Sequence, residues 1–137
     1  MTTLEILSVL GISTILSTVV TSVINHYISV NKGKSSARQE FKESRYKAVM
    51  LLAYAYLYYE REKDMLLLKR PELKTKELLQ NELEAELINM YLYASDEVIF
   101  RLETFLNESL EPTLNSLAIS MRKDLYGIKT TIEHKKY

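Results

Sequence analysis

The sequence predicts an all-α protein in which an N-terminal transmembrane helix is followed by an antiparallel bundle of three to four helices. The chain of 137 residues contains only three glycines and two prolines, whereas β-sandwiches, barrels and nucleotide-binding α/β folds need turn-forming residues between frequent short elements. Residues 6–31 carry no charged side chain, and beyond them apolar residues recur at the three- and four-residue steps of a helix. The chain also lacks cysteine, which excludes a disulfide scaffold, thiolate zinc sites and cysteine nucleophiles.

Residues 1–31 are assigned as a membrane anchor because the uncharged run is long enough to cross a bilayer. Its 26 residues span about 39 Å as a helix, against roughly 30 Å of hydrocarbon. Serine and threonine side chains interrupt the apolar residues, and a helix can satisfy their hydroxyls on its own backbone carbonyls. We therefore expect a single-pass transmembrane helix whose partner is the lipid bilayer.

Three other structures stay open for the same run. A cleaved signal peptide needs positive charge before the apolar stretch and small residues at a cleavage site, but only Glu5 and the start amine precede it, and bulky His26 and Tyr27 lie near its end. A buried helix of a soluble bundle would be long for so small a domain. An interfacial amphipathic helix carries Lys or Arg along one face, and this run has none.

Basic residues directly after the run predict its orientation. The positive-inside rule places the lysine- and arginine-rich side of a span in the cytoplasm, and the five residues before the run contain neither type. We expect a short N-terminus outside and a cytoplasmic C-terminal domain, with the basic residues as a topology signal that can also touch anionic lipid head groups. They are Lys32, Lys34, Arg38, Lys42, Arg45 and Lys47.

The cytoplasmic part begins with a predicted linker and a long helix. Residues 32–36 are rich in Gly, Ser and Lys and are interpreted as a juxtamembrane linker in which a serine caps the next helix. Residues 37–69 contain neither Gly nor Pro, and from Phe41 onward their apolar positions keep the helical period. Pro71 ends this helix, because the residue before a proline avoids the helical region.

Further helices complete the predicted bundle, which covers residues 37–127. One helix begins near Glu72. At Ser95 a cap is followed by acidic residues while the apolar period continues, so one bent helix and two separate helices both fit. A last helix covers residues 113–126 and stops at Gly127, and residues 128–137 form a frayed tail. The seam of the helix after Glu72 comprises Leu79, Leu83, Leu87, Tyr91 and Ala94, with Glu77, Glu82, Glu84 and Glu86 mostly outside it.

The residues needed for most kinds of chemistry are missing. His26 and His134 are the only histidines, and neither has a carboxylate at a ligand or catalytic spacing. Glu-x-x-His pairs and a glycine-rich phosphate loop are absent from the sequence. We therefore expect no enzyme activity, catalytic residue, cofactor, metal site or small-molecule substrate. We also expect no nucleic-acid binding, because the basic stretch adjoins the membrane and the rest of the chain is acidic enough to repel phosphate.

Two sets of residues are candidate interfaces. Five of the ten tyrosines lie between positions 46 and 59 and would occupy every side of a helix, so we expect Tyr54 and Tyr58 on its flank to face a partner or to coat the bundle. In the span, Ser13, Ser17 and Thr21 form a ridge of small residues that allows close helix approach. From the tyrosines and from the ridge of small residues we expect homo-oligomerisation, with coiled-coil-like contacts between helices.

The formal net charge of zero is the sum of unlike segments. Residues 32–76 hold 12 basic and 6 acidic side chains, residues 77–121 hold Arg101 alone against 9 acidic side chains, and residues 122–137 hold 5 basic and 2 acidic ones. The simpler interpretation is attraction between segments within the bundle. The alternative is that the acidic middle forms a docking face for a basic partner.

The stretches LYASDEVI, from Leu92 to Ile99, and MRKDL, from Met121 to Leu125, follow the span and the long tyrosine-bearing helix. In these stretches and in their order along the chain, the protein resembles small single-pass bacterial and phage membrane proteins of unknown function. The resemblance implies a membrane anchor, a cytoplasmic helical domain and no assigned activity. It marks as candidate polar determinants Ser95, Asp96, Arg122, Lys123 and Asp124. Caps and helix-end cations account for these residues equally well.

Together these features predict a membrane-anchored scaffold, adaptor or accessory subunit that acts through protein contacts. The alternative from another class is a membrane-active oligomer, such as a small pore or a holin-like protein, in which hydroxyl-bearing spans line a wet path.

Overall fold

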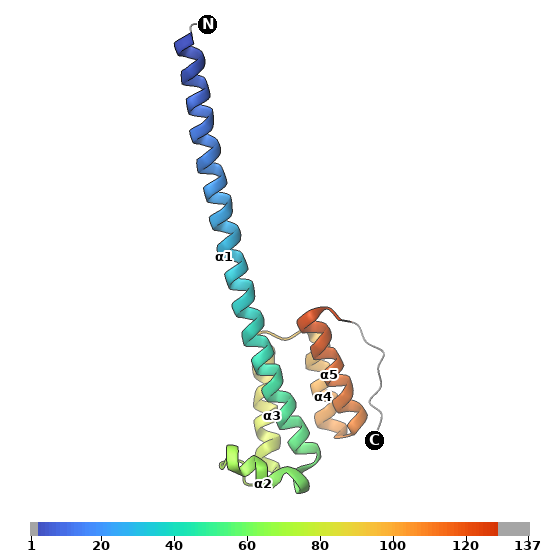
Figure 1. Cartoon of the computed structure of the whole chain (residues 1–137). Helices are drawn as coiled ribbons and strands as arrows, with labels where there is room; N and C mark the ends of the chain where they lie inside the picture. The colour runs from blue at the N-terminus through green and yellow to red at the C-terminus, as the bar shows by residue number, and fades with distance from the viewer. Residues whose placement is uncertain (1–2, 129–137) are drawn as a thin grey trace. The chain divides into compact units, whose positions relative to one another are not determined.

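The computed structural model describes the backbone of residues 3–128 and the side chains of residues 18–128. This part of the chain forms five helices and no strand (Figure 1), which confirms the all-α prediction. The helices are α1 (Thr3–Leu57), α2 (Tyr59–Lys69), α3 (Lys76–Met90), α4 (Asp96–Glu108) and α5 (Glu111–Tyr126).

The chain divides into two compact units, Met1–Gln39 and Glu40–Tyr137. In the first unit the backbone is helical from Thr3, and residues 18–39 are exposed. Within the described part of the chain, no helical stretch is both long enough and apolar enough to cross a membrane. The side chains of residues 3–17, which belong to the predicted anchor, lie outside the described part.

The prediction that residues 32–36 form a linker is wrong at the level of secondary structure. These residues are helical and belong to α1. A single glycine costs a helix only about 1 kcal/mol relative to alanine, and no proline interrupts the backbone hydrogen bonds, so the helix continues through Gly33.

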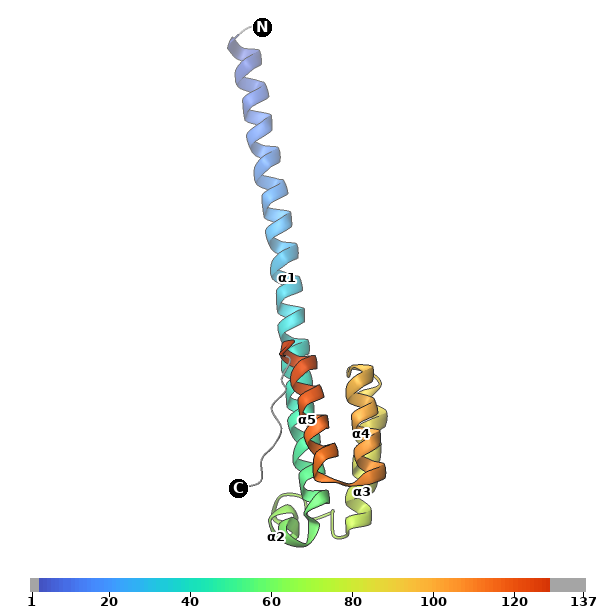
Figure 2. The same ribbon diagram turned by 90° about the vertical axis from the view of Figure 1, so that its right-hand side faces the viewer.

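The second unit is an up-and-down bundle of four antiparallel helices. They are the end of α1 from residue 40 on, α3, α4 and α5 (Figures 1 and 2). Within the unit α5 packs most extensively against α4, and α4 also contacts α3. The helix α2 lies in the connection between α1 and α3 and has no buried residue. Short connections between successive helices give this topology.

The predicted single helix over residues 37–69 is wrong, because α1 ends at Leu57 and α2 begins at Tyr59. Tyr58 leaves the helical region with φ −112° and ψ 40°, and the Tyr59 hydroxyl donates to the Lys74 backbone carbonyl at 3.0 Å. Both flanking segments are helical, so the apolar period runs through the break and hides it.

Helix ends follow local capping rules more closely than apolar spacing. The start of α3 is at Lys76 rather than near Glu72, because Thr75 is the N-cap and its hydroxyl accepts from the Leu78 backbone N–H at 3.1 Å. Ser95 caps α4 in the same way. Of the two alternatives at this residue, one bent helix or two separate helices, the structure therefore has two separate helices. Gly127 ends α5 in the left-handed region at φ 66°, as predicted.

The core lies between the four bundle helices and matches most of the predicted seams. Three corrections apply. Tyr91, predicted to lie in the seam, follows the last residue of α3 and is 64% exposed. Phe41 is 53% exposed, and its ring packs edge-to-face with that of Tyr93 at a centroid distance of 5.4 Å. In α3 the buried position after Leu83 is Glu86, whereas Leu87 is only partly buried. The most deeply buried side chains are Tyr46, Val49, Ala53, Leu79, Leu83, Met90, Val98, Leu102, Phe105 and Leu117.

Candidate docking groove

An apolar groove of about 520 Å³ runs between the end of α1 and α5 in the second unit. The inner row of its lining comes from both helices at helical spacing: Tyr46 and Met50 on α1, Met121 and Leu125 on α5. Tyr46 and Met121 are buried, and the other two are half-buried. Two helices that present parallel apolar rows with a gap between them form the kind of surface that accepts a third helix.

The two lips of the groove are the outer rows of the same helices. On α1 they are Glu43, Lys47 and Leu51, and on α5 they are Ala118, Arg122 and Tyr126. Leu51 is 68% exposed and Tyr126 is 50% exposed. Large apolar side chains at a lip that have no cover are typical of a contact surface.

Glu43 and Tyr126 form a bridge across one end of the groove. The Glu43 carboxylate pairs with Lys47 at 2.7 Å and also accepts from the Tyr126 hydroxyl. These two donors lower the pKa of Glu43, with Lys47 as the larger cause, while the bond to Glu43 raises the pKa of Tyr126. The bridge therefore joins α1 to α5 at the end of the groove where α5 stops.

The floor of the groove is fixed by a polar contact below it. The Tyr46 hydroxyl donates to the Asp124 carboxylate, which also pairs with Lys42 at 2.7 Å. Burial, and then the bond to Asp124, raise the pKa of Tyr46. Since Tyr46 is 2% exposed, this contact sets how far α5 lies from α1.

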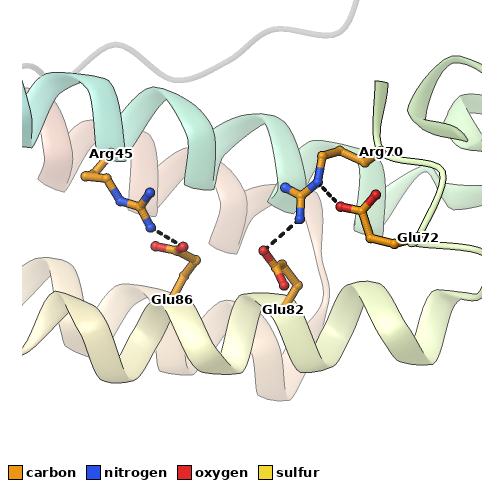
Figure 3. A network of polar contacts seen from close by, with 5 residues as sticks. All are labelled: Arg45, Arg70, Glu72, Glu82 and Glu86. Atoms are coloured by element: carbon orange, nitrogen blue, oxygen red, sulfur yellow. Dashed lines mark hydrogen bonds and ion pairs between the residues drawn. The ribbon is translucent and has the colours of Figure 1, made fainter. Parts of the chain in front are cut away.

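Another side of α1 is tied to α3 by an ion pair that sequence reasoning missed. Arg45 pairs with Glu86 (Figure 3), and Glu86 is only 9% exposed. In the same figure Arg70 pairs with Glu72 and, at 2.9 Å, with Glu82 on α3. A signal was present, because Glu86 lies three residues after Leu83 and so continues the Leu79–Leu83 seam.

The predicted basic cluster separates into two groups. Lys32, Lys34 and Arg38 are exposed on the first unit. The other three belong to the second unit, where each is ion-paired: Lys42 with Asp124, Arg45 with Glu86 and Lys47 with Glu43.

The two candidate interface tyrosines pack against each other and beside Arg61. The rings of Tyr54 and Tyr58 pack at 5.0 Å, and the Arg61 guanidinium lies 4.4 Å from the Tyr58 ring centroid. The Tyr58 hydroxyl donates to Glu111 at 3.0 Å. Tyr54 exposes 39% of its surface, and both tyrosines lie around the break between α1 and α2.

The candidate polar determinants lie at helix ends and on the groove. Ser95 is a cap, and Asp96 lies in the first turn of α4. Lys123 pairs with Glu97 at 2.9 Å. Asp124 accepts from Tyr46, while Arg122 lines the groove and makes no ion pair with any residue that the structure describes.

The remaining candidates belong to α1. Thr21 is exposed there, and Ser13 and Ser17 lie outside the described side chains. Among the described residues, no group of three or more His, Asp or Glu side chains is placed to hold a metal ion.

Comparison with known proteins adds no assignment to this geometry. No protein-family model, curated protein or solved structure significantly matches the chain.

Proposed function

We propose that this protein is a membrane-anchored adaptor that holds a helix of a protein partner in the groove between α1 and α5. Residues 6–31 would insert in the bilayer, and the helical bundle would lie in the cytoplasm. The uncharged run and the basic residues after it support this arrangement. The adaptor role needs no catalytic or cofactor residue.

The groove is the single observation that carries the proposal. Its lining is apolar at the floor and mixed at the lips, which is the composition of protein interfaces with an apolar centre and a polar rim. Helix-in-groove recognition uses apolar anchors at positions i, i+3 or i+4 and i+7. The partner helix would supply these anchors, and the apolar rows of α1 and α5 would form the walls between which it lies.

A photo-crosslinking side chain placed in the full chain at Leu51 tests the proposal in native membranes. Leu68 on α2 is the matched control, because it is 79% exposed but lies away from the groove. We expect a discrete adduct from position 51 and none from position 68. Ala118→Trp, which fills the groove without removing a core contact, should abolish the adduct; equal adducts at both positions would contradict the proposal.

A second candidate function, a membrane-active oligomer, is favoured by one observation on the first unit. Thr18, Thr21, Ser22 and Asn25 line a shallow polar hollow on α1, and small hydroxyl residues allow spans to associate closely. This function predicts leakage from liposomes that contain the intact protein. Thr18→Leu should then abolish leakage, while Ala118→Trp should leave it unchanged; an adaptor without pore activity causes no leakage.

A further inference from the structure

We propose that the groove accepts the outer row of α3 from a second copy of this chain. Two copies would then associate through the groove of one and the α3 row of the other. The inference rests on the proposed function and names its partner. The row is defined by Glu84, Ile88 and Leu92, which succeed one another at four-residue steps from α3 into the corner before α4.

The charges at the groove call for an acidic occupant. Lys47 lies at the middle of the α1 lip, and Arg122 lies at the corresponding place on the α5 lip. Lys47 is neutralised by Glu43 at 2.7 Å, but Arg122 has no ion-pair partner among the described residues. An occupant that carries a carboxylate beside apolar side chains would pair with Arg122 and also cover the apolar lining of the groove.

The row on α3 has this combination. Ile88 is 70% exposed, and Leu92, in the turn after α3, is 87% exposed. Glu84 lies one helical turn before Ile88 and is exposed. Tyr91 and Phe100, at 64% and 59% exposed, widen the apolar surface toward α4. These are the largest uncovered apolar side chains around the α3–α4 corner, and they match a groove that also lacks a cover.

The occupant cannot be the row of the same copy. Within the bundle α3 contacts α1 through Arg45 and Glu86 and packs against α4, so its outer row faces away from the groove between α1 and α5. The segment 129–137 is a poorer occupant, because it holds Lys129, Lys135 and Lys136 against one acid and would bring further positive charge to Arg122.

Cysteine crosslinking of the full chain tests the contact, and the absence of native cysteine removes background. Leu51→Cys and Leu92→Cys are made in separate, differently tagged copies and mixed in mild detergent. We expect a dimer between them under oxidation, whereas Leu51→Cys mixed with Leu68→Cys should give at least several-fold less. A yield equal to this control, or a dominant 51-to-51 dimer, would overturn the proposal; the latter would indicate a two-fold groove-to-groove contact.

A charge exchange adds an independent criterion. Arg122→Glu in the Leu51→Cys copy should lower the crosslinking yield several-fold, and Glu84→Lys in the Leu92→Cys copy should restore it. Failure of the restoration would contradict the assigned pairing. If copies do not crosslink but the position-51 adduct in membranes persists and is lost with Ala118→Trp, the second-copy inference fails while the adaptor function stands; loss of both rejects both.

Discussion

Arg45 and Glu86 join α1 to α3 through a charged pair that the bundle largely covers. One Glu86 oxygen accepts from Arg45, whereas the other oxygen and the Tyr93 hydroxyl are buried without a hydrogen-bond partner among the described residues. Burying a charge costs free energy that only a well-placed partner recovers. The pair therefore specifies how α3 lies against α1 more than it adds to stability.

Removing Glu86 should destabilise the bundle because Arg45 then keeps a partly buried charge with no counterion. We expect Glu86→Ala to lower the free energy of unfolding by about 1–3 kcal/mol, measured by urea denaturation of the full chain in mild detergent. The double variant Arg45→Met, Glu86→Leu should regain most of this loss. Glu60→Ala, which breaks the exposed pair with Lys63, should cost less than about 0.5 kcal/mol.

Tyr46 should make stability sensitive to alkaline pH. Burial and the bond to Asp124 raise its pKa above the ordinary value of 10.0, so the folded chain holds this proton more tightly than the unfolded chain does. The stabilisation is complete below pH 10 and is lost as the pH rises further. We expect Tyr46→Phe to be less stable by about 1–2 kcal/mol at neutral pH and to lose less stability above pH 10, as followed by denaturation across pH. An identical slope in both proteins would contradict this assignment.

At the scale of elements, caps decide where helices begin and end. Thr75 and Ser95 each accept from a backbone N–H three residues later, at 3.1 and 3.4 Å, and Gly127 takes the left-handed conformation that ends α5. Each of these satisfies backbone groups that a helix end leaves without partners. The corner between α3 and α4 depends on Ser95 in particular, because the apolar period alone would continue the helix.

Replacing the Ser95 cap should loosen this corner. We expect Ser95→Ala to cost about 1 kcal/mol of unfolding free energy, while Ser95→Asp should be nearly neutral because aspartate caps as well as serine. Ser116→Ala is the matched control, since its hydroxyl bonds a carbonyl inside α5 rather than a helix start. Circular dichroism during thermal unfolding measures all three, and an equal loss for Ser95→Ala and Ser116→Ala would argue against a capping role.

The sequence predicts elements where a single local signal decides and misses those that depend on tertiary contacts. Pro112 in the first turn of α5 and Gly127 at its end were both identified correctly. The break at Tyr58 was missed, because the Tyr59 contact with Lys74 joins residues that no local pattern relates. The groove was missed for the same reason, although the stretch containing Arg122 and Asp124 had been singled out.

At the scale of the whole molecule, the oppositely charged segments of the sequence form ion pairs with one another within the second unit. Basic residues of the segment 32–76 pair with acids of the segment 77–121 through Arg45–Glu86 and Arg70–Glu82, and Lys123 pairs with Glu97. These pairs favour the interpretation that the segments attract one another inside the bundle. Glu84 and Arg122 have no part in these contacts between segments and stay available at the surface.

The proposed membrane anchor makes its own prediction for the intact protein. A lysine at the centre of a span costs roughly 3 kcal/mol on insertion scales, so Val20→Lys should move the protein from the carbonate-resistant membrane fraction to the soluble fraction. Phe41→Lys is the control, because this exposed residue lies beyond the uncharged run. If the native protein is itself released by carbonate, the anchor is rejected.

The bridge between Glu43 and Tyr126 gives the groove a direction. At that end Glu43 and Tyr126 from the two lips interact with each other, whereas Leu51 and Ala118 line the other end. The two ends therefore differ in chemistry, so an occupant fits the groove better in one direction than in the other. A crosslink at Leu51 reports on the apolar end of the groove.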